Sequence, residues 1–123
     1  MDFNDLSERL YTAVVSDILD SMGLREQSPN IELALMSGNR LLMGHAKTLS
    51  WVDCLDPEDE TYAPMIAAVD SVKPGEVVVS AATGSNRSAL WGELLSTATH
   101  MRGGRGAIVE GAVRDIAQMR SMD

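Results

Sequence analysis

Apolar residues near the start of the chain recur at helical spacing over residues 5–22. The residues that share this spacing are Leu6, Leu10, Ala13, Val14, Ile18 and Ser21. This pattern predicts one amphipathic helix, which Asn4 or Asp5 can cap and which ends at Gly23. Asp17 falls on the apolar stripe, and a buried carboxylate needs partners. We therefore expect a hydrogen bond from a neighbouring loop to Asp17 rather than a catalytic role.

The middle of the chain is more polar. Residues 23–40 hold Pro29 and Gly38 and predict a loop with at most one short ordered segment. Residues 44–52 alternate in part between apolar and polar side chains, which predicts a strand. The acidic run at residues 53–60 is typical of a solvated helix start, where carboxylates complement the helix dipole. A metal cluster there is the alternative, although the run lacks the alternating ligands of a calcium loop.

The second half of the chain alternates between helical and strand patterns. Helices are predicted over 59–72, 92–102 and 115–122, and buried strands over 76–81 and 107–109. The apolar faces of the first two helices are predicted to comprise Tyr62, Met65, Ile66 and Val69, and Leu94, Leu95, Ala98 and Met101, respectively. Strands that alternate with helices indicate an α/β fold.

Composition narrows the class of protein. The chain has 123 residues, of which 45% are hydrophobic and 23% charged, values typical of a single globular domain. Acidic residues outnumber basic ones 18 to 10, and a net charge of −8 disfavours nucleic-acid binding. The single cysteine, Cys54, fits a reducing compartment. No apolar run is long enough for a membrane span, and no signal peptide is evident, so a cytoplasmic location without a membrane partner is expected.

Two loops that follow predicted strands are candidate binding regions, because ligands of open α/β sheets bind beyond the carboxyl ends of strands. The first loop runs over residues 85–93 and leads into the helix that begins near Gly92. The backbone N–H groups from Gly92 through Leu95 could attract an anion, and Gly92 would let a ligand approach the backbone. The alternative is an ordinary helix start, with Gly92 present for packing.

The second loop covers residues 111–115 and holds the adjacent pair Arg114 and Asp115. A guanidinium can grip a carboxylate through two parallel hydrogen bonds. A neighbouring carboxylate can hold magnesium, which takes only one or two such ligands and keeps its waters. The alternatives are a local ion pair between the two residues and capping of the last helix by Asp115.

The remaining candidates are weaker. His45 and His100 have no second ligand at metal-binding spacing nearby, and Cys54 has neither a CxxC partner nor a nucleophile motif. The glycine-rich run at residues 103–106 follows a helix rather than a strand, so it is not a dinucleotide-binding fingerprint. We expect packing or surface roles for these residues.

At the two loops the chain resembles the RraA-like family, which contains 4-hydroxy-4-methyl-2-oxoglutarate aldolases and the regulator of ribonuclease E activity. The resemblance lies in residues 91–95, Ala98, Arg102-Gly103, Arg105-Gly106 and 110–115. Upstream segments agree in the same order, at residues 12–20, 44–48 and 73–79. The match therefore extends over nearly the whole chain.

The resemblance implies a swivelling β/β/α fold, assembled as homotrimers or hexamers with sites near subunit contacts. Family members usually continue past the Arg-Asp helix through further strands. We therefore expect residues 1–123 to be a single RraA-like domain that lacks the C-terminal strands of the family. A fragment, a shortened relative that assembles with partners and a degenerate copy are all consistent with this length.

The family also implies roles for particular residues. It commonly has an Asp where this chain has Glu93, twenty-one positions before Arg114. By this likeness the amides of Gly92, Glu93, Leu94 and Leu95 would bind the pyruvate-like end of the substrate. Arg114 would hold its carboxylate or keto oxygen, Asp115 would ligate magnesium or manganese, and Glu93 would act as the base.

The implied activity is that of a divalent-metal-dependent pyruvate aldolase with oxaloacetate decarboxylase side activity. Both reactions pass through a pyruvate enolate, and a divalent ion stabilises its charge. The small substrate is then a keto acid. The alternatives are a non-enzymatic regulator that binds a ribonuclease, for which an acidic surface is suited to a basic partner, and an inactive truncated relative.

Overall fold

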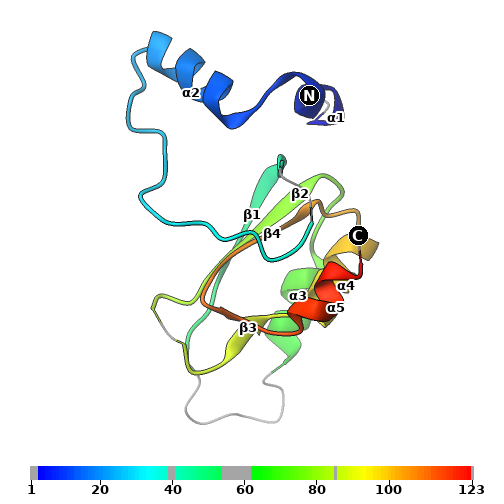
Figure 1. Ribbon diagram of the computed structural model, residues 1–123. Helices are drawn as coiled ribbons and strands as arrows, with labels where there is room; N and C mark the ends of the chain where they lie inside the picture. The colour runs from blue at the N-terminus through cyan, green and yellow to red at the C-terminus, as the bar shows by residue number, and fades with distance from the viewer. Residues whose placement is uncertain (1–2, 39–40, 54–61, 85, 123) are drawn as a thin grey trace. The chain divides into compact units, whose positions relative to one another are not determined.

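A computed structural model describes residues 3–38, 41–53, 62–84 and 86–122. The chain divides into two compact units, Met1–Leu35 and Met36–Asp123 (Figure 1). The predicted acidic run and Cys54 fall almost wholly outside the described residues, and the single-domain prediction stays a prediction.

The first unit holds two helices, so the prediction of one continuous helix over residues 5–22 is wrong. Helix α1 spans Phe3–Arg9 and helix α2 spans Thr12–Ser21. Tyr11 lies between them with extended backbone angles (φ −140°, ψ 164°), which no helix can continue. The helical spacing of apolar residues in the sequence runs on past Tyr11, so the pattern alone does not reveal the break in the backbone.

The end of α2 is as predicted. Gly23 has φ +81°, and the N–H groups of Gly23 and Leu24 donate to the carbonyls of Asp20 and Leu19. These two bonds form a Schellman motif, for which glycine is the preferred residue. Neither α1 nor α2 has a buried residue, and Asp17 is exposed. The expectation of a buried Asp17 carboxylate is therefore wrong, because the stripe on which it lies is not covered within this unit.

The second unit is built on a parallel three-stranded sheet with the order β1-β2-β4. The strands are β1 (His45–Ser50), β2 (Glu76–Ala81) and β4 (Gly106–Glu110). They confirm the predicted strands at 44–52, 76–81 and 107–109. Parallel neighbours need crossover connections, and helices α3 (Ala63–Asp70) and α4 (Glu93–Met101) lie in these connections.

A second, smaller sheet joins segments that were predicted to be loops. Strands β3 (Ala89–Trp91) and β5 (Ala112–Val113) pair in parallel, with Trp91 opposite Val113. Strands this short carry no readable alternation, and each is stabilised by a partner far away in the sequence. Helix α5 (Ile116–Arg120) follows β5 and lies within the predicted final helix.

The core lies between the sheet and its helices, and Figure 1 shows α3, α4 and α5 on one side of the sheet. Its buried cluster consists of Val72, Val78, Trp91 and Met119, with Leu49, Leu95, Ala107, Val109, Val113 and Ile116 packed against it. The predicted helix faces are only partly correct. Val69 is buried, but Tyr62, Ile66, Leu94 and Met101 are exposed, because contact with the sheet decides which side of a helix is covered.

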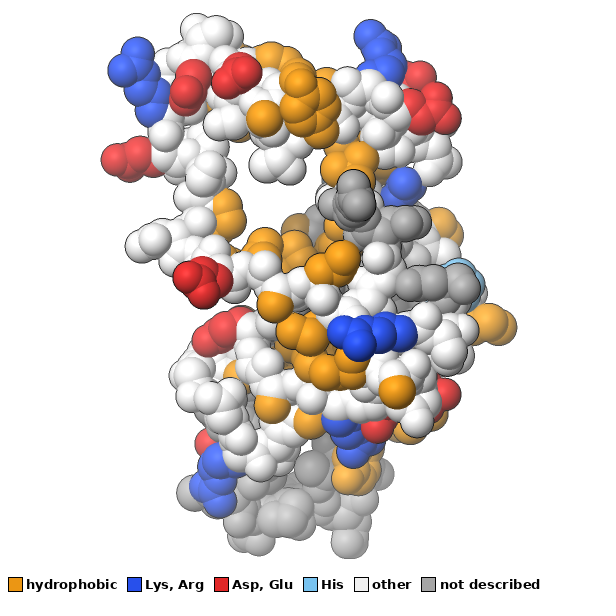
Figure 2. Space-filling model, viewed as in Figure 1, with side chains coloured by type: hydrophobic (Ala, Val, Ile, Leu, Met, Phe, Trp, Pro, Cys, Tyr) orange, Lys and Arg blue, Asp and Glu red, His pale blue; other side chains and the backbone are white. Residues whose placement is uncertain are grey.

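The other face of the sheet is covered less completely. Val79 and Ile108 are half-buried there, and the Leu42 side chain lies over Gly106. Figure 2 shows apolar side chains at the surface of this unit, interspersed with charged ones. No helix among the described residues has both the length and the apolar content needed to cross a membrane.

Candidate functional site

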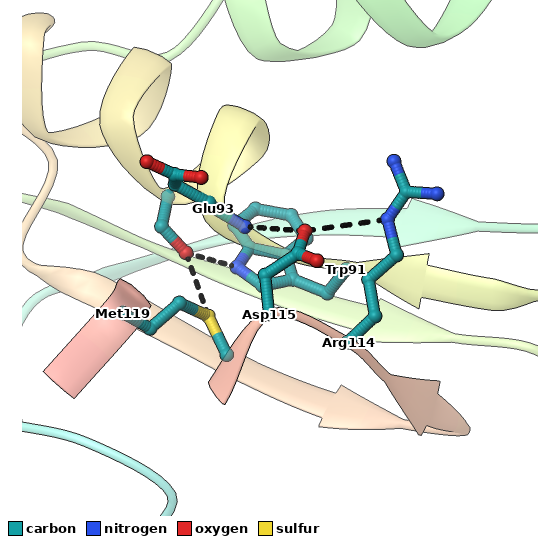
Figure 3. Close-up of polar contacts among 6 residues, drawn as sticks. Trp91, Glu93, Arg114, Asp115 and Met119 are labelled. Carbon is teal, nitrogen blue, oxygen red and sulfur yellow. Dashed lines mark hydrogen bonds and ion pairs between the residues drawn. The ribbon is translucent and has the colours of Figure 1, made fainter. Parts of the chain in front are cut away.

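The two predicted loops meet because β3 pairs with β5. The Arg114 N–H donates to the Trp91 carbonyl at 2.9 Å, directly after the ladder between the two strands. This bond places the start of α4, at Gly92 and Glu93, beside Arg114 and Asp115. All four residues therefore lie in one region of the second unit, in which Figure 3 labels Glu93, Arg114 and Asp115.

The Asp115 side chain is directed toward α4 rather than toward its own helix. Asp115 occupies the N-cap position of α5 in the left-handed conformation (φ 57°, ψ 34°) and makes no side-chain capping bond. Its Oδ2 atom instead accepts a long hydrogen bond of 3.4 Å from the Glu93 backbone N–H. Aspartate is one of the few residues other than glycine that tolerate this backbone region. Asp115 is thus the N-cap residue of α5, as the alternative predicted, but its side chain does not cap the helix.

Gly92 permits this arrangement through its lack of a side chain. Its backbone is extended (φ −169°), so no special dihedral angle requires glycine here. A Cβ atom at Gly92 would lie 2.6 Å from Asp115 Oδ2 and 2.9 Å from Arg114 Cγ. In this structure the group that approaches Gly92 closely is Asp115, which corresponds to the packing alternative stated above.

The charged groups of the site are accessible. Arg114 Nε lies 3.4 Å from Asp115 Oδ2, and the two side chains are 65% and 37% exposed, respectively. The predicted local ion pair is therefore present, but an exposed pair of this kind contributes only about 0–1 kcal/mol. The Glu93 side chain is also exposed, and in Figure 3 it and the Arg114 side chain extend to opposite sides of the Asp115 carboxylate. Both remain free to rearrange around a ligand.

Sequence reasoning missed the polar contacts beneath the site. Trp91 Nε1 donates to Ser96 Oγ at 2.9 Å, and the Ser96 hydroxyl donates to Met119 Sδ at 3.2 Å. Trp91 and Met119 are 4% and 6% exposed, respectively. Ser96 lies one helical turn after Gly92, but no local pattern indicates that its hydroxyl has two partners.

The described residues contain no group of three or more His, Cys, Asp or Glu side chains that could hold a metal ion. A single accessible carboxylate, Asp115, is nevertheless compatible with magnesium, which is commonly bound through one or two carboxylates and retains waters. His45 lies at the start of β1 and His100 in the last turn of α4. Asp115 is therefore a carboxylate of this site that could ligate a hard divalent ion.

Comparison with known proteins identifies the family. The sequence pattern of the RraA-like family (Aldolase/RraA) matches residues 12–123. Among solved structures, the chain is similar to RraAS2 of Streptomyces coelicolor, described as an unusual member of the RNase ES inhibitor RraA protein family. The two share 31% identity with a TM-score of 0.69, over 91% of this chain and 54% of that chain.

Two further structures are similar. An uncharacterized protein from Pseudomonas syringae pv. tomato str. DC3000 has 29% identity and a TM-score of 0.70, over 95% of this chain and 50% of that chain. The RNA-processing inhibitor RraA from Thermus thermophilis has 24% identity and a TM-score of 0.69, over 91% of this chain and 62% of that chain, a likeness that shows the fold alone. The chain thus spans about half the length of the first two structures.

The family match covers the elements that build the site, from α2 through α5. It confirms both the resemblance drawn from residues 91–115 and the α/β fold that the resemblance implies. The chain belongs to the RraA-like family, which includes aldolase and decarboxylase enzymes as well as ribonuclease E inhibitors.

Proposed function

We propose that this chain carries the site of a divalent-metal-dependent pyruvate aldolase. It would cleave acids of the 4-hydroxy-4-methyl-2-oxoglutarate type and decarboxylate oxaloacetate as a side reaction. The observation that supports this most directly is the position of Asp115 Oδ2, 3.4 Å from both the Glu93 backbone nitrogen and Arg114 Nε. A carboxylate, a guanidinium and a helix start therefore lie within one small region.

The anionic substrate would be held by donors from two elements. The first N–H groups of α4 have no partner within the helix and lie at the positive end of its dipole. Arg114, at 65% side-chain exposure, can offer two parallel N–H donors to a carboxylate. Together these groups favour a small keto acid, as local donors in a chain whose net charge is −8.

Asp115 is the residue that would hold the divalent ion, magnesium or manganese. When bound, such an ion polarises the keto oxygen of a substrate as a Lewis acid. Asp115 can turn toward an ion at little cost, because the two contacts that now hold its carboxylate are 3.4 Å long and accessible to solvent. A hydrogen bond of this length is weaker than the usual bond of about 2.9 Å.

Glu93 and Arg114 would carry the proton and charge steps. The Glu93 carboxylate, which is exposed at the start of α4, would take the proton from the C4 hydroxyl as general base. The C3–C4 bond then breaks, its electron pair passes to the pyruvate enolate, and C4 becomes the carbonyl of a second keto acid. Arg114 would stabilise the developing negative charge with its N–H donors. Loss of carbon dioxide from oxaloacetate leaves the same enolate.

The test is pyruvate release by the purified chain. Pyruvate is measured by a coupled dehydrogenase assay with 4-hydroxy-4-methyl-2-oxoglutarate and with oxaloacetate. Activity is expected to disappear after chelation and to return with magnesium or manganese. Light scattering in parallel would test the proposed homotrimer or hexamer. Folded, assembled protein that releases no pyruvate above the metal-only background would overturn the proposal.

A second candidate function is the regulation of a ribonuclease by protein binding. It is favoured by the likeness to RraAS2, at 31% identity, a member of a ribonuclease inhibitor family. Inhibition of purified ribonuclease E by this chain, unchanged in an Asp115→Asn variant, would support it. An inactive relative is the third possibility, and it predicts neither pyruvate release nor ribonuclease inhibition.

A further inference from the structure

The Ser96 hydroxyl lies between the buried side chains of Trp91 and Met119, which Figure 3 labels beside Asp115. It accepts a hydrogen bond from Trp91 Nε1 at 2.9 Å and donates one to Met119 Sδ at 3.2 Å. A serine hydroxyl has one donor and two acceptor positions, so these two contacts fix its orientation at both ends. Trp91 and Met119 belong to the hydrophobic core and are 4% and 6% exposed, respectively.

This contact links the first turns of the two helices that form the site. The Ser96 N–H donates to the Gly92 carbonyl at 3.0 Å and closes the first turn of α4. The Met119 N–H donates to the Asp115 carbonyl at 3.0 Å and closes the first turn of α5. Each partner of the hydroxyl–thioether contact therefore lies one turn below a residue of the site. The contact therefore joins the first turn that begins at Gly92 to the first turn that begins at Asp115.

We propose that Ser96 is a positioning residue, whose hydroxyl holds α4 and α5 in the register in which the Asp115 carboxylate reaches the start of α4. Its effect on metal and substrate rests on the proposed function, whereas its effect on the geometry does not. Without the hydroxyl, the Trp91 N–H loses its acceptor at a buried position. A buried donor without a partner is unfavourable, so the indole has to move. Because Trp91 directly precedes Gly92, that movement reaches the site.

The same pair of helices supplies a matched control. Thr97 Oγ1 donates to Met122 Sδ at 3.8 Å, which is also a hydroxyl–thioether contact between α4 and the chain just after α5. Thr97 is exposed and its contact is longer. A Thr97→Ala variant therefore removes the same chemistry without touching the buried side chains below the site.

The experiment compares the wild type with Ser96→Ala, Ser96→Thr and Thr97→Ala in the full chain. Manganese affinity is measured by electron paramagnetic resonance, and kcat and KM are measured with oxaloacetate. Amide hydrogen exchange is measured at Glu93 and Arg114. Misplacement of a site by about 1 Å, even from a mutation far from the chemistry, can lower activity about 100-fold, and we expect Ser96→Ala to weaken manganese binding and to lower kcat/KM by up to that factor. Exchange at Arg114, which reports the β3–β5 contact, should accelerate. Ser96→Thr keeps the hydroxyl and should retain the manganese affinity and the exchange rate of the wild type. Both quantities should stay within twofold of the wild-type values in Thr97→Ala.

Three results would separate the possibilities. Unchanged manganese affinity and exchange in Ser96→Ala would overturn the inference, and so would equal effects of Ser96→Ala and Thr97→Ala. The wild type could bind no manganese and release no pyruvate, which would contradict the proposed function. If exchange is then still faster in Ser96→Ala and not in Thr97→Ala, the positioning role of Ser96 is supported. If Ser96→Ala does not fold, Ser96→Cys keeps the size with a weaker donor and is judged by the same criteria.

Discussion

The carboxylate of Asp115 lies 3.4 Å from the backbone nitrogen of Glu93, a residue 22 positions earlier in the chain. The contact joins the starts of two different helices, and the parallel pairing of β3 with β5 makes it possible. Its length and exposure leave the carboxylate available to a ligand.

Replacement of Gly92 by alanine should disrupt the site. The new Cβ would lie 2.6 Å from Asp115 Oδ2, so the Asp115 and Arg114 side chains must move. Small displacements at a site can lower activity about 100-fold, and we expect this loss in kcat/KM with oxaloacetate. Gly84→Ala is the control, since its Cβ meets no atom within 4 Å and it reports only the cost of a positive φ. Equal activity of the two variants would contradict the prediction.

Asp115→Asn should abolish manganese binding while the fold is preserved. Asparagine tolerates the left-handed backbone of this position (φ 57°) nearly as well as aspartate, so the change removes the charge without adding strain. The measurements are electron paramagnetic resonance and thermal unfolding. Glu110→Gln, an exposed acid at the end of β4, should retain manganese binding. Retention of full affinity by Asp115→Asn would assign the metal to other residues.

Arg114→Ala should chiefly raise KM. The guanidinium is 65% exposed, so its removal should alter the free energy of unfolding by less than about 0.5 kcal/mol. Loss of a charged hydrogen bond to substrate costs about 1.5–3 kcal/mol, which corresponds to a KM for oxaloacetate roughly 10–150 times higher. Arg102→Ala is the control, since Arg102 pairs with Asp70 outside the site. An unchanged KM would remove Arg114 from substrate binding.

Val78→Ala should destabilise the second unit. Val78 lies in the middle of β2 with none of its surface exposed. The lost methyl groups and the cavity they leave should cost about 2–3 kcal/mol in chemical denaturation. Val52→Ala removes the same atoms from a side chain that is 84% exposed, and its effect should be close to zero. Similar effects of the two variants would mean that the core lies elsewhere.

Local patterns in the sequence were sufficient for the strands of the three-stranded sheet and for the end of α2. The strand Glu76–Ala81 could be predicted because a continuous β-branched run is typical of a strand covered on both faces. The end of α2 at Gly23 could be predicted because a left-handed residue after a helix favours glycine. The family resemblance at residues 91–115 likewise depends on the order of residues alone.

What only the tertiary structure decided depends on contacts between distant residues. The break at Tyr11, the short strands β3 and β5 and the exposed side of α4 have no local periodicity to reveal them. The sequence by itself determined that Gly92, Glu93, Arg114 and Asp115 follow predicted strands. The pairing of β3 with β5 decided that these four residues meet. The packing of α4 against α5 decided that Ser96 lies between Trp91 and Met119. Such pairing depends on the whole fold, because each partner alone is too short to be stable.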